Sequence, residues 1–143
     1  MQYFRIVSVL LAAALLPYGL VLAADALTAT NEVLLKSASS WDGTSDIRYP
    51  DGAPELTTLK ITIPPRTNLP WHTHPMPNVA YVLSGELTVE QREGGQSKTI
   101  KAGDVLPEMV NIDHRGRTGD SPVVLIVFYA GTKGMPLSVT SKE

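Results

Sequence analysis

The sequence contains no cysteine and only three histidines among its 143 residues. Without cysteine, disulfides, thiolate metal sites and thiol catalysis are excluded. Lysine and arginine number 12 against 14 aspartates and glutamates, so the basic excess typical of nucleic-acid binding is missing and no nucleic-acid partner is expected. This length is enough for one domain with a core of its own.

The first 24 residues are predicted to be a secretory signal peptide. Arg5 precedes a short apolar run over residues 6–16, Pro17 and Gly19 follow, and small residues lead to Asp25. The alternative is a retained membrane anchor, but the apolar run is short for a membrane span. Cleavage after residue 23 or 24 would leave a secreted or periplasmic protein without a stable membrane anchor. Loss of Arg5 changes the formal net charge from −2 to −3.

Short strand-like segments, separated by turn residues, fill the remainder of the chain. Residues 25–55 are expected to form one strand, over residues 32–36, and a long loop, and residues 56–143 are expected to form the main domain. Within that domain strands are predicted at 56–63, 69–74, 78–83, 86–91, 97–101, 105–113 and 123–129. The last of these is apolar throughout and is expected to be buried on both faces. Many short strands without a helical period predict an all-β sandwich or barrel.

The three histidines form a spacing that is typical of a metal site. His72 and His74 are two residues apart in a strand-like stretch, which places both on one face. His114 follows forty residues later beside another predicted strand. Imidazoles that converge from two strands can bind one divalent metal, whereas an empty pocket is the alternative.

These stretches resemble the two sequence motifs of the cupin family. The first is carried by His72, His74 and Gly85, and the second by Gly103 and His114. The resemblance covers roughly residues 55–131. It implies a double-sheet, jelly-roll-like cupin β-barrel that is often dimeric, with one divalent metal (Fe, Zn, Mn or Ni) inside near one end.

The chain departs from the family pattern at several positions. Arg66 and Asn111 stand where the motifs have glycine, and Asn78 stands where the family has a glutamate ligand. Asn78 is either a neutral fourth ligand or a hydrogen-bonded core residue. With Asn78 as ligand the site would keep a formal charge of +2, which favours anionic ligands. Glu108 is the candidate for the missing carboxylate, as ligand or catalytic base; the alternative is a solvent-facing charge at a turn.

Other residues are candidates for substrate binding or association. Arg115 and Arg117 could receive a carboxylate or phosphate, or could pair with Asp113 or Asp120 in a solvated turn. Trp71 could line the pocket or serve in packing.

An apolar stripe is expected on the outer face of residues 78–83. Its members, Val79, Tyr81 and Leu83, point away from the metal and favour a homodimer interface.

Three functions follow from these expectations. The first is a metal-dependent enzyme that acts on a small, anionic organic molecule, by Lewis-acid or dioxygenase-like chemistry. The second is a non-catalytic module that binds a metal or metabolite. The third is a structural cupin that assembles with a partner, since the fold alone does not decide among them.

Overall fold

The computed structural model describes residues 28–45 and 47–142. The chain divides into two compact units. Of the first unit, Met1–Asn31, only residues 28–31 are described, and they are exposed and irregular. The predicted signal peptide lies outside the described residues. No described helix is long and apolar enough to cross a membrane.

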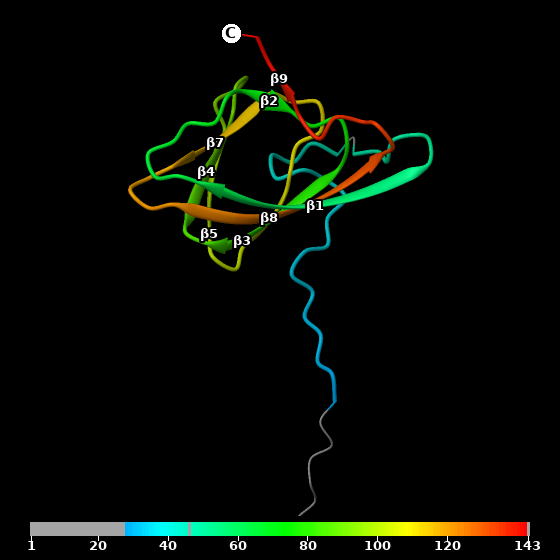
Figure 1. The fold of residues 1–143 in the computed structure, drawn as a ribbon, viewed down its shortest axis with the longest axis horizontal. Helices are drawn as coiled ribbons and strands as arrows, with labels where there is room; N and C mark the ends of the chain where they lie inside the picture. Colours follow the sequence, from blue (N-terminus) through cyan, green and yellow to red (C-terminus); the bar gives the residue numbers. More distant parts are fainter. Residues whose placement is uncertain (1–27, 46, 143) are drawn as a thin grey trace, which may run out of the picture. The chain divides into compact units, whose positions relative to one another are not determined.

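The described residues of the second unit, Glu32–Glu143, form nine strands. These strands make two antiparallel sheets (Figure 1). The first sheet has the order β1-β8-β3-β6 and the second the order β5-β4-β7-β2-β9. The strands are β1 Pro54–Ile63, β2 His72–Thr73, β3 Asn78–Ser84, β4 Glu86–Gln91, β5 Ser97–Lys101, β6 Val105–Pro107, β7 His114–Thr118, β8 Val123–Thr132 and β9 Val139–Thr140. The prediction of an all-β, double-sheet fold is confirmed.

The core lies between the two sheets, because inward side chains alternate with outward ones along the strands. In β3, for example, Ala80 and Val82 are fully buried while Val79 and Tyr81 are partly exposed. The same alternation occurs in β8, so the expectation that this strand is buried on both faces is wrong. Phe128, on its outer side, is 40% exposed.

Three predicted strands are absent or much shorter in the structure. Residues 32–36 form no strand. Only His72–Thr73 of the 69–74 segment is a strand, since Pro70 and Pro75 cannot donate to a ladder. The 105–113 segment leaves the sheet after Pro107 and turns at Asn111, which has a φ of 55°.

Two positions where the family motifs have glycine keep a left-handed backbone conformation, although this chain has other residues there. Arg66 and Asn111 have φ values of 54° and 55°. Gly85 has a φ of 84°, and a Cβ there would lie 2.4 Å from the carbonyl oxygen of Pro122. Glycine is therefore required at position 85 for both conformation and space, whereas a side chain is accommodated at 66 and 111.

Candidate metal centre

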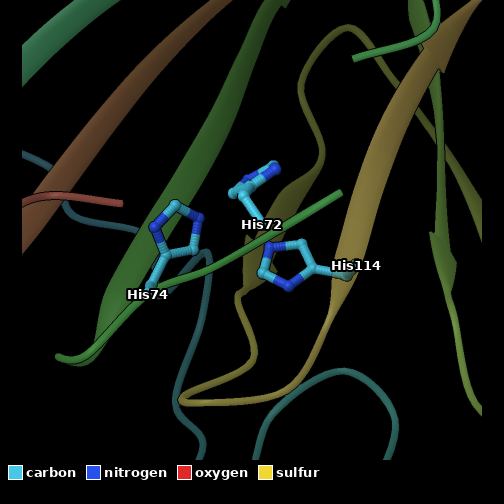
Figure 2. Close-up of side chains that lie close together, drawn as sticks. All are labelled: His72, His74 and His114. Carbon is cyan, nitrogen blue, oxygen red and sulfur yellow. The ribbon is translucent and has the colours of Figure 1, made fainter. Parts of the chain in front are cut away.

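The five-stranded sheet brings the three histidines together on its inner face. His72 and His114 are direct partners across β2 and β7, and His74 forms a bridge with Val110 just beyond β2. Their ring centroids are 4.6–5.0 Å apart, and one ring nitrogen from each lies within 4.8 Å of the others. Figure 2 shows the three rings close together. The predicted convergence of the histidines is confirmed, and the group could hold a metal ion.

Backbone carbonyls orient all three imidazoles in the same way. Nδ1 of His72 lies 2.9 Å from the carbonyl oxygen of Pro70, and Nδ1 of His114 lies 2.7 Å from that of Ile112. Nδ1 of His74 lies 2.7 Å from the carbonyl oxygen of Leu137. A carbonyl can only accept, so Nδ1 carries the proton in each neutral ring. Nε2 is left with a free lone pair, as in histidines that bind metals.

The segment that follows Gly134 supports this arrangement. β9 pairs with β2, with Thr140 opposite His72 and Val139 opposite Thr73. The backbone N–H of Ser141 donates to the carbonyl oxygen of Trp71 at 2.9 Å. Sequence reasoning missed this support, because a backbone carbonyl such as that of Leu137 has no residue-type signature.

Glu108 joins the histidines inside the barrel. Its side chain is 11% exposed, and its Oε2 lies 3.3 Å from Nε2 of His114. Side chains alternate between inside and outside along β6, and this alternation continues to the residue after the strand. Glu108, two residues after the fully buried Leu106, therefore also points inward. A solvent-facing turn charge, the alternative considered from sequence, is therefore wrong.

Burial and charge act in opposite directions on these groups. Burial lowers the pKa of His72, and lowers that of His74 to about 4. Burial also lowers the pKa of His114, but the contact with Glu108 and its charge raise it above 6.5 overall. Burial raises the pKa of Glu108, but the hydrogen bond to His114 and the charges of the histidines lower it by more. The net result is a pKa below the ordinary 4.5. Without metal and near pH 6.5, these directions favour a protonated His114 beside an ionised Glu108 and two neutral imidazoles.

The polar groups lie at one end of a cavity of about 70 Å³. Its remaining wall is mainly apolar and includes Ile61, Leu87, Leu125 and Val127. At roughly 10–15 Å³ for each water-sized atom, it admits about five to seven atoms. No lysine or arginine is among the described residues that line it, so a metal would be its main source of positive charge.

Asn78 and Tyr129 also line the cavity, as register partners on β3 and β8. Asn78 is 3% exposed, and its Oδ1 has no hydrogen-bond partner among the described residues. Sequence reasoning placed Asn78 near the metal but missed Tyr129, whose ring centroid lies 5.7 Å from that of His74. Burial and the charge of Glu108 raise the pKa of Tyr129 to about 12, so it stays a neutral phenol.

The predicted substrate contacts lie elsewhere. Arg115 and Trp71 stack on each other, with the guanidinium carbon 4.3 Å from the ring centroid, and border a depression outside the barrel. Arg115 and Arg117 both pair with Glu90, at 2.5 and 3.6 Å, rather than with Asp113 or Asp120. The alternation that turns His114 inward turns Arg115 and Arg117 outward. Neither arginine lines the cavity, and Trp71 does not line it either.

Comparisons with known proteins agree with this architecture. A family model described as a cupin domain matches residues 59–129, and no curated protein matches the sequence. The fold is similar to the DMSP lyase DddQ of Ruegeria pomeroyi DSS-3, at 24% identity and a TM-score of 0.54. That match covers 60% of this chain and 43% of the lyase, so the chain spans less than half of that protein's length.

Two further structures show the same fold. The polyketide cyclase RemF of Streptomyces resistomycificus is 20% identical, with a TM-score of 0.54 and 68% of each chain covered. An oxalate decarboxylase of Bacillus subtilis with Mn(II) centres is 21% identical, with a TM-score of 0.52. Its match covers 59% of this chain and 23% of the decarboxylase. At these identities the likeness concerns the fold.

Proposed function

This chain belongs to the cupin family, and from that premise we propose that it binds one divalent metal and a small organic molecule inside its barrel. His72, His74, His114 and Glu108 would hold the metal. The observation that carries the proposal is the shared orientation of the three imidazoles, each with Nδ1 bound to a carbonyl, so that Nε2 is the nitrogen available to a metal. The Mn(II) centres of a similar fold support a divalent ion.

Glu108 fits the role of fourth ligand better than Asn78. Ligand atoms about 2.0–2.2 Å from one metal are about 3 Å apart when they occupy neighbouring positions. The 3.3 Å between Glu108 Oε2 and His114 Nε2 is close to this separation. Both atoms are buried and lack a well-formed hydrogen bond among the described residues, so both have a free lone pair when His114 is neutral. A carboxylate also lowers the formal charge of the site from +2 to +1.

The apolar cavity determines what such a site could do. The metal would act as a Lewis acid on an oxygen of the bound molecule, or activate oxygen if it is iron. The small volume and mainly apolar wall of the cavity favour a ligand of a few non-hydrogen atoms. An anionic ligand would find its positive partner at the metal, since no cationic side chain among the described residues lines the cavity. If Glu108 dissociated from the metal, its carboxylate could accept a proton from the bound molecule.

A non-catalytic binding module is the second candidate, because the only carboxylate described in the cavity is also the proposed ligand. Metal-loaded protein that binds small carboxylates without converting them would favour this module. Turnover that depends on the metal would favour the enzyme. The same purified protein serves both measurements.

Metal analysis of purified protein tests the site itself. His72→Ala, His74→Ala and His114→Ala should each strongly reduce metal content, and Glu108→Gln should reduce it as well. Glu86→Gln is the matched control, because Glu86 is exposed at the start of β4. Metal content that is unchanged in the three histidine variants would refute the proposal.

We also propose that the protein is exported and forms a homodimer. Export is supported by the charged, apolar and small residues over 1–24. N-terminal sequencing of the mature protein should begin at residue 24 or 25, whereas a full-length, membrane-retained chain would refute export. Dimer formation is supported by the partly exposed apolar residues of the outer face of β3, where Leu83 is 50% exposed.

A further inference from the structure

Asn78 has a buried amide oxygen that no described group satisfies. Its Nδ2 lies 3.4 Å from the carbonyl oxygen of Met76, which assigns the donor end of the amide. Oδ1 is therefore the end without a partner. Because buried acceptors are almost always hydrogen-bonded in folded proteins, this one indicates a partner that comes from outside the chain.

Asn78 lies on the wall of the cavity in which a metal-bound molecule would lie. Asn78 begins β3 on its inward side, in the row that continues with Ala80 and Val82. It lines the same cavity as the histidines and Glu108. Since Glu108 supplies the proposed oxygen ligand, Asn78 remains available for the bound molecule.

We infer that Asn78 Oδ1 accepts a hydrogen bond from a small metal-bound ligand. The ligand class is one in which an O–H or N–H group lies beside the oxygen that binds the metal, as in a 2-hydroxy acid. The cavity of about 70 Å³ admits a molecule of this size. This inference rests on the proposed metal site.

Two isomeric probes separate the hydrogen bond from metal coordination. Lactate and methoxyacetate have the same number of non-hydrogen atoms, and each carries a carboxylate with an oxygen on the next carbon. Only lactate can donate from that oxygen. The Co²⁺-loaded protein is titrated with each probe, and the visible absorption of the metal monitors binding. The titrations give the two dissociation constants.

Asn78→Leu should lower the preference for lactate over methoxyacetate by about tenfold, the effect of one buried hydrogen bond. Its affinity for Co²⁺ should not change. Asn78→Asp keeps an acceptor, so it should keep the preference while both anions bind more weakly. Asn68→Leu, at an exposed position outside the cavity, is the matched control. If Asn78→Leu does not fold, Asn78→Ala is judged by the same ratio.

The outcomes distinguish the inference from its premise. An unchanged preference in Asn78→Leu would overturn the inference. A loss of Co²⁺ affinity comparable to that of a histidine variant would overturn it as well, because Asn78 would then be a metal ligand. Failure of the unsubstituted protein to bind Co²⁺ would instead refute the proposed function.

Discussion

Metal binding should displace a proton from His114. Near pH 6.5 this imidazole is more than half protonated, because the contact with Glu108 raises its pKa despite burial. His74, with a pKa of about 4, carries almost no proton at that pH, and the pKa of His72 is lowered as well. A metal can bind Nε2 of His114 only after the proton leaves.

The magnitude follows from the geometry of the pair. At 3.3 Å and an effective dielectric constant of about 20, the gross attraction between His114 and Glu108 is roughly 5 kcal/mol before burial is counted. This attraction acts against burial, and the pKa of His114 is raised overall while that of Glu108 is lowered. Each proton displaced makes metal affinity rise about tenfold per pH unit while pH is below the pKa of His114. Above that pKa the dependence should disappear.

Calorimetry in two buffers with different ionisation enthalpies counts the protons that are released. At pH 6.5 the unsubstituted protein should release more than half a proton per metal. Glu108→Gln removes the effect that raises the pKa of His114 and leaves burial, which lowers it, so the release should fall. Glu86→Gln should behave as the unsubstituted protein. An undiminished release in Glu108→Gln would refute the reasoning, since His114 would then not depend on Glu108.

Three further predictions concern stability, binding and assembly. Gly85→Ala should lower the free energy of unfolding by about 2 kcal/mol or more in urea titrations, because its Cβ would meet the Pro122 carbonyl oxygen at 2.4 Å and its φ is 84°; an unchanged midpoint would contradict the close contact. Arg115→Ala should leave Co²⁺ and lactate affinities unchanged, since Arg115 pairs with Glu90 outside the cavity; weaker lactate binding would restore its predicted substrate role. Tyr81→Lys should convert the proposed dimer into a monomer in light scattering at tens of micromolar protein, whereas an unsubstituted protein that is already monomeric would exclude the interface.

Much of the fold was predictable because turn residues and alternation act locally. The strands at 86–91 and 97–101 match the prediction residue for residue, since Gly94 and Gly95 mark the turn between them. The 69–74 segment failed because prolines on either side interrupt its ladder, which a pattern of apolar residues does not register.

The site was predictable to the extent that it depends on strand geometry. Spacing placed His72 and His74 together, and the same alternation already implies that Arg115 points away from His114. The position of Glu108 depends on where β6 ends and how the chain turns at Asn111. The even spacing between Glu108 and His114 does not predict either feature. Tyr129 needed the register of β3 against β8, a tertiary property.

The hydrogen bond between His74 and Leu137 shows that the site needs residues beyond the end of the family match. The family match ends at residue 129, yet the carbonyl that orients His74 lies at residue 137, 63 positions along the chain from that histidine. A chain shortened to residues 59–129 would contain all three histidines without this orientation. During synthesis, the ring of His74 can become fixed only after residue 137 has been added. The three imidazoles therefore reach their common orientation only in a chain that extends at least to residue 137.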